Sequence, residues 1–157
     1  MPSRQDSILS EVEVGSLRVL GSPVEDIFAS NEYNIALILG KHFRSGEWGK
    51  YRCGSVVTCV ISGRSVYARV NKFFTVDGDD CVGYASVTWF GAPEYPLDRS
   101  PLVVRCREED PDRLVDAYGC VVKLTQIDPC QVMVERDLHT GYCWMMRDSG
   151  FDTVRDD

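Results

Sequence analysis

One stretch, Ser65 to Pro96, limits what this chain can fold into more than any other, because it has the pattern of a β-hairpin. Between residues 66 and 71, small or apolar side chains alternate with larger or polar ones, the two-residue period of a strand with one buried face. Asp77-Gly78 supplies a pair that tolerates positive φ and favours a hairpin turn. Alternation resumes over residues 84–90, and the prolines at 93 and 96 end the pairing because they have no amide hydrogen to donate. These residues predict strands at 65–76 and 82–90.

Other short apolar runs bounded by turn residues predict further strands. They lie at 55–61, 101–106, 120–127, 131–135 and 142–146. About seven short strands separated by turn signals are typical of a small barrel or sandwich. A closed barrel is favoured because closure removes unpaired strand edges. The sequence therefore predicts a mainly β domain, a small distorted β-barrel, over residues 51–146, followed by a polar tail at 147–157.

The first 50 residues have a different pattern. Residues 1–22 are predicted to be a flexible segment, with a possible short strand from Glu11 to Leu20. Ser22-Pro23 with Glu25 resembles a capped helix start, and the apolar residues behind it fall on one helical stripe up to Gly40. We expect one N-terminal helix at about 23–39, followed by a linker to residue 50. The alternative is a break near residues 30–31, with a strand at 35–39.

Charge and hydropathy exclude two classes of partner. The 157 residues fit one domain, and 17 Lys and Arg against 24 Asp and Glu give a net charge of −7. Binding to a phosphate backbone depends on Lys and Arg, so we do not expect direct nucleic-acid binding. No run approaches the roughly 20 apolar residues of a membrane helix, and the first residues have no signal-peptide core, so we expect no membrane association.

The cysteines and histidines predict neither a metal site nor an enzyme. The seven cysteines are odd in number and form no CxxC pair. We therefore expect free thiols in a reducing, intracellular compartment, no cofactor, and no zinc site, because structural zinc ligands usually come in closely spaced pairs. Only His139 lies near a cysteine, Cys143, and a nucleophile would need these two side chains in contact.

Several of these segments are similar to a known family. Tyr67-Ala68-Arg69-Val70, then residues 85–90 (ASVTWF), then Ala92-Pro93-Glu94, resemble the core of a bromo-adjacent homology (BAH) domain. Residues 102–104 and 119–122 fall where the family has further strands, so the resemblance covers about 51–135. It implies a distorted β-barrel that binds other proteins in a chromatin setting, and hence a nuclear location. Some members bind methylated lysine on histone tails through an aromatic cage, which uses cation–π attraction.

The family's cage residues transfer only in part. Trp89 matches the cage tryptophan, whereas Val66 and Gly91 stand where the family has aromatic residues. The candidates to complete a different peptide-binding site are Tyr67, Tyr84, Tyr95 and Glu94. The alternative for Trp89 is a core residue, because large aromatics in strands usually serve packing.

An acidic segment offers a second candidate surface. Glu108, Glu109 and Asp110 are typical of a solvated loop, and the functional alternative is that they dock a basic peptide such as a histone tail. The first hypothesis is therefore a non-catalytic interaction module. The second is a structural subunit that joins a larger complex through the predicted 23–39 helix. The third, an enzyme, requires contact between Cys143 and His139.

Overall fold

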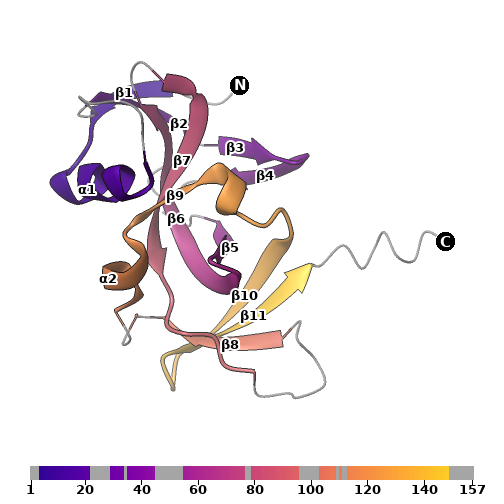
Figure 1. Cartoon of the computed structure of the whole chain (residues 1–157). Helices are drawn as coiled ribbons and strands as arrows, with labels where there is room; N and C mark the ends of the chain where they lie inside the picture. The colour runs from indigo at the N-terminus through magenta and orange to yellow at the C-terminus, as the bar shows by residue number, and fades with distance from the viewer. Residues whose placement is uncertain are drawn as a thin grey trace.

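A computed structural model of the chain describes residues 4–21, 29–33, 35–44, 55–76, 79–95, 103–108, 110 and 113–148. The fold is mainly β, as predicted, and Figure 1 shows its sheets with one helix of more than two turns. The helices are α1 (Glu11–Val19), α2 (Leu114–Tyr118) and a short 3₁₀ turn at Leu124–Gln126. Among the described residues the strands pair into separate sheets without closing a barrel, so the barrel stays a prediction.

The largest sheet is built around the predicted hairpin. Its strands are β1 (Arg4–Ile8), β2 (Ala29–Tyr33), β6 (Arg64–Val76), β7 (Asp79–Trp89) and β9 (Val121–Lys123) in that order, with β5 (Val56–Ile61) also pairing with β6. The pairing of β6 with β7, which sets Ala68 opposite Trp89, confirms the hairpin. The predicted turn residues 77 and 78 lie outside the described residues.

The second sheet contains three strands in the order β10 (Gln131–Asp137), β11 (Tyr142–Asp148) and β8 (Val103–Arg107). All three strands were predicted, although β11 extends into the segment predicted as a polar tail. Of the strand predicted at 120–127, residues 121–123 form β9, 124–126 form the 3₁₀ turn, and Ile127 is extended and makes an isolated bridge with Cys59. One face of this sheet packs on β5 and β6 through a cluster that includes Val56, Tyr67, Val104 and Met145.

The N-terminal third differs most from the sequence-based expectation. The predicted helix at 23–39 is wrong, because β2 and β3 (Ile35–Ile38) occupy 29–33 and 35–38, and β3 pairs with β4 (Lys41–Arg44). The alternative strand at 35–39 is confirmed, while residues 22–28 lie outside the description. Pairing of β2 with both β1 and β6 supplies hydrogen bonds that override the local helical pattern.

The strand expected from Glu11 to Leu20 is also wrong, because these residues form α1. Ser10 Oγ accepts a hydrogen bond from Glu13 N at 3.2 Å, and Glu13 Oε1 accepts one from Ser10 N at 2.9 Å. This capping box satisfies two amide groups that a helix start leaves unpaired. The Ser-x-x-Glu spacing was visible in the sequence, and it was the signal that distinguished a helix here from a strand. Residues 4–8, expected to be flexible, form β1.

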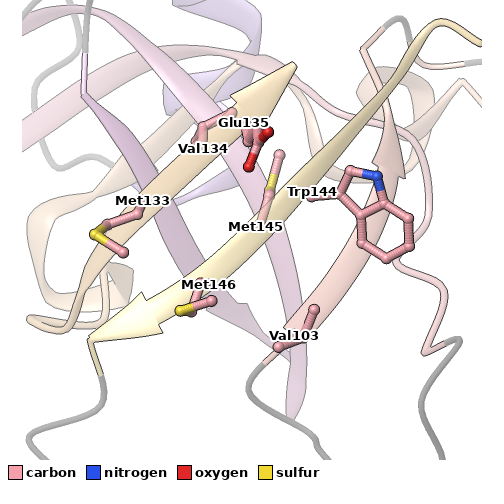
Figure 2. A pocket seen from close by; sticks show the side chains of 7 residues that line it. All are labelled: Val103, Met133, Val134, Glu135, Trp144, Met145 and Met146. Carbon is pink, nitrogen blue, oxygen red and sulfur yellow. The ribbon is translucent and has the colours of Figure 1, made fainter. Parts of the chain in front are cut away.

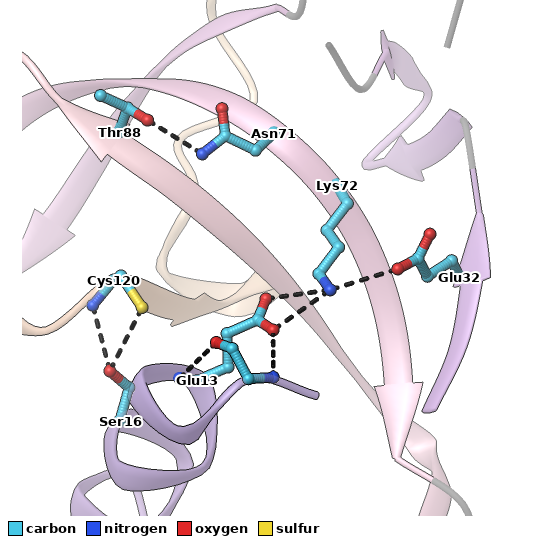
Figure 3. Close-up of polar contacts among 8 residues, drawn as sticks. Glu13, Ser16, Glu32, Asn71, Lys72, Thr88 and Cys120 are labelled. Carbon is cyan, nitrogen blue, oxygen red and sulfur yellow. Dashed lines mark hydrogen bonds and ion pairs between the residues drawn. The ribbon is translucent and has the colours of Figure 1, made fainter. Parts of the chain in front are cut away.

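A buried ionic cluster fastens α1 and β2 to the large sheet (Figure 3). Lys72 Nζ on β6 lies 3.0 Å from Glu13 Oε2 and 3.2 Å from Glu32 Oε1, and all three residues are buried. Lys72 follows a register shift in the pairing of β6 with β7. The cluster therefore joins three segments that are distant in sequence through a single ammonium group.

Candidate peptide-binding site

The structure places the three central aromatic candidates in the core. Tyr67, Tyr84 and Trp89 are only 2%, 1% and 3% exposed. Each belongs to a different buried cluster, so they do not come together as a cage. Trp89 Nε1 donates a hydrogen bond to the Gly119 carbonyl at 2.6 Å, and its ring packs edge-on against Tyr118. A peptide contact by these three rings stays a prediction, and their burial in separate clusters does not favour it.

Tyr95 and Glu94 lie at the surface beside the second sheet. Tyr95 is 50% exposed. Glu94 pairs with Arg105 of β8 through its backbone, and its Oε1 lies 3.0 Å from Arg105 Nη2. The hydrogen bond from Arg105 lowers the pKa of the Glu94 carboxyl below its usual value. These two predicted residues therefore border the outer face of this sheet.

The predicted acidic docking residues already have intramolecular partners. Glu108 Oε1 lies 2.5 Å from Arg136 Nη2. Asp110 accepts a hydrogen bond from the backbone amide of Leu114 at the start of α2, and Glu109 lies outside the described residues. Glu108 and Asp110 do share with Trp89 the lining of a hollow of about 470 Å³. Their charges are used mainly to hold the chain together, which weakens the prediction of free docking carboxylates.

A different groove lies on the outer face of the second sheet (Figure 2). It has a volume of about 340 Å³, and its lining includes Met133, Glu135, Trp144, Met146 and Val103. These side chains share one face because they fall in two cross-strand rows. The first row is Met133, Met146 and Val103, and the second is Glu135, Trp144 and Arg105. Side chains directly opposite in a sheet stand about 5 Å apart, so each row is a continuous contact surface.

The groove exposes apolar side chains that the described part of the fold leaves uncovered. Met133 is 61% exposed and Met146 is 46% exposed. Trp144 is half-buried, and the Arg105 guanidinium lies 5.9 Å from its ring centroid. Methionine and tryptophan are both enriched where proteins bind other proteins, because they supply large adaptable or rigid apolar contacts.

Glu135 gives this apolar groove one negative charge. The side chain is exposed, and it has no hydrogen bond or ion pair with any of the residues that the structure describes. An extended cationic side chain fits this arrangement. Its methylene stem can lie along Met133 and Met146 while its charged end meets the Trp144 ring and the Glu135 carboxylate.

Sequence reasoning missed these residues although it predicted their strands. Met133 and Glu135 are two positions apart in β10, and Trp144 and Met146 are two positions apart in β11. The alternation shows that each pair shares a face, but both faces of these strands contain apolar residues. Only the packing of Met145 and Val104 into the core shows which face is turned outward.

The remaining chemical candidates are separated. Cys143 is buried, and burial raises the pKa of its thiol, whereas His139 is exposed in the turn before β11. The described residues contain no group of three or more side chains suited to hold a metal ion. Within the same residues, no helix is long and apolar enough to cross a membrane.

Comparison of the chain with protein-family models, with curated proteins and with solved structures finds no match.

Proposed function

We propose that this chain is a non-catalytic protein-interaction module that binds a basic peptide segment in the groove between β10, β11 and β8. The observation that supports it is the row in which Glu135 and Trp144 lie directly opposite each other beside the exposed Met133 and Met146. The two methionines can contact the methylene stem of a lysine or arginine side chain. The Glu135 carboxylate and the Trp144 ring can both attract its charged end.

The binding steps follow from this arrangement. The net charge of −7 attracts a cationic segment and speeds its encounter with the protein. The stem of the basic side chain then displaces water from the two methionines, and the charged end comes to rest between Trp144 and Glu135. Neighbouring residues of the peptide contact Val103 and the border formed by Glu94 and Tyr95.

The wider hypothesis is that the module is BAH-like, with its strands arranged as a distorted barrel, and that it acts in the nucleus on a histone tail. The segments between residues 51 and 135 that resemble this family support it, as does the acidic charge. In this proposal Trp144 takes the role that the family resemblance assigned to Trp89. Basic histone tails are the ligands to test first.

The test is a titration of histone-tail peptides, methylated and unmethylated, against the wild-type chain and two variants. Trp144→Ala is expected to weaken binding about 5- to 30-fold, because a cation–π contact and its apolar area contribute about 1–2 kcal/mol. Glu135→Gln is expected to weaken it several-fold and to reduce its dependence on salt. Calorimetry or fluorescence anisotropy measures both effects.

Leu138→Ala is the matched control, because Leu138 is 86% exposed in the turn between β10 and β11 and does not line the groove. It should bind like the wild-type chain. Equal affinity of all four proteins would contradict the proposed groove. A correctly folded wild-type chain that binds none of the peptides would contradict peptide binding itself.

That last result would favour the alternative function, a structural subunit of a larger assembly. Exposed apolar residues border a second groove, of about 350 Å³, between α1 and α2. Val12 is 63%, Val19 87% and Val115 42% exposed. Val12, Gly15 and Val19 have helical spacing, so α1 presents the apolar stripe that an assembly role requires, in place of the helix expected at 23–39.

A further inference from the structure

Charge is distributed unevenly across the outer face of the second sheet. Glu135 and Asp137 project from β10 at one edge, and Arg105 and Arg107 project from β8 at the other. The register places Glu135 and Arg105 in the row of Trp144, and Asp137 and Arg107 in the next row, that of Tyr142. The face therefore has an acidic edge and a basic edge, separated by an aromatic strand.

The basic edge is held in place by the aromatic strand. The Arg105 guanidinium lies 4.6 Å and that of Arg107 lies 4.9 Å from the centroid of the Tyr142 ring. Arg105 forms an ion pair with Glu94, whereas Arg107 is exposed and acts on the Glu94 carboxylate without a close ion pair to any described residue. Glu135, on the opposite edge, forms no ion pair with the described residues either. Each edge therefore presents exposed charge of one sign to a partner.

Such a face is complementary to itself. A two-fold axis that lies in the plane of the face and runs along β11 places β10 of one copy over β8 of a second copy. The rows keep their positions under this rotation, so the acidic edge of each copy meets the basic edge of the other. Trp144 and Met146 then lie near the axis, against the same residues of the second copy. Sheets that pack face to face with nearly aligned strands are a common arrangement, and a two-fold interface uses the same patch twice.

We infer that the outer face of the β10-β11-β8 sheet pairs two copies of this chain as a symmetric dimer. The occupant is a second copy for three reasons. The face has opposite charges at its two edges and exposed apolar side chains between them, and a two-fold rotation sets the acidic edge of one copy over the basic edge of the other. The strands are only five to seven residues long, so the interface is small and the dimer is weak and dependent on concentration. The dimer covers the proposed peptide groove, so a bound peptide and a second copy exclude each other.

The test uses sedimentation velocity over a concentration series, with two charge reversals. Asp137→Lys alone and Arg107→Glu alone, at two positions that the rotation sets opposite each other, should each raise the dimer dissociation constant at least about tenfold, because like charges then meet twice in each dimer. An equal mixture of the two variants should recover dimers. In the mixed pair, one contact has its two charges exchanged and the other is unchanged, so both contacts join opposite charges.

Lys41→Glu is the matched control for Arg107→Glu, because it makes the same change from positive to negative charge at an exposed residue of β4. It should dimerise like the wild-type chain, and circular dichroism should show that every variant is folded. A wild-type chain that stays monomeric, or a mixture that does not recover dimers, would overturn the inference. Its failure is distinguishable from failure of the peptide proposal, because a monomer that binds peptides refutes only the dimer. A chain that dimerises at high concentration but binds no peptide at concentrations where it is monomeric refutes only the peptide proposal.

Discussion

Lys72→Met is expected to lower the free energy of unfolding by about 3–5 kcal/mol, because it leaves two buried carboxylates without their counter-ion. Lys72, Glu13 and Glu32 are 7%, 7% and 6% exposed, and the ammonium group is the only cation in contact with either carboxylate among the described residues. Chemical denaturation measures the loss, and thermal unfolding should shift by about 10 °C.

The matched comparison is a variant in which the whole cluster is neutral, Lys72→Met with Glu13→Gln and Glu32→Gln. It should be more stable than Lys72→Met alone, because removing a buried charge network entirely costs less than removing one partner. A single variant as stable as the wild-type chain would show that the cluster is hydrated and contributes little.

The pH dependence of this loss follows from the direction of two pKa shifts. Burial tends to raise the pKa of Glu13, but the Ser10 amide and Lys72 outweigh it and leave the pKa below its ordinary value of 4.5. Burial tends to lower the pKa of Lys72, but Glu13 and Glu32 raise it above 10.5. The stability that the Glu13 carboxylate contributes is fully present above the pKa of this group in the unfolded chain, and it is lost as the pH falls through the lower pKa of the folded chain. The stability that the Lys72 ammonium contributes is fully present below the pKa of this group in the unfolded chain, and it is lost as the pH rises through the higher pKa of the folded chain. The difference between wild-type and Lys72→Met should therefore be greatest near neutral pH and shrink below about pH 4.5.

Trp89→Ala is expected to destabilise the chain by about 3–5 kcal/mol, the usual cost of removing a buried aromatic side chain. The ring lies in the largest core cluster, and its Nε1 hydrogen bond to Gly119 O helps to hold the segment between α2 and β9. Gly119 has a φ of 73°, and a Cβ there would lie 2.8 Å from Ser16 Oγ, so this segment also passes close to α1. Urea denaturation measures the effect.

Trp89→Phe separates the hydrogen bond from the packing. It retains most of the apolar volume and leaves the Gly119 carbonyl without its donor, so a smaller loss of about 1–3 kcal/mol is expected. Under conditions where both variants remain folded, peptide affinity should be unchanged. A Trp89→Ala variant with wild-type stability and no peptide binding would instead restore Trp89 as a contact residue.

Periodicity was sufficient to locate most strands. The alternating segments at 65–76 and 82–90 and the short apolar runs at 55–61, 131–135 and 142–146 all form strands, because a two-residue apolar period, or an apolar run too short for a helix, buries its side chains in an extended chain. It failed in the N-terminal third. There residues 30–33, which the predicted helix at 23–39 included, pair with the distant strand β6, and the capping box of Ser10 and Glu13 begins the helix that does form.

The two tryptophans show what the sequence determined and what tertiary structure decided. Both were identifiable from sequence as strand residues with large apolar side chains. Trp89 is buried because β7 is an interior strand with clusters on both faces, as the assignment of Tyr84 and Ala85 to different clusters shows. Trp144 is half-exposed because β11 belongs to a sheet that is covered on its inner face only. Local sequence sets the period of a strand, but the layers packed above and below it decide which of its side chains remain free to bind.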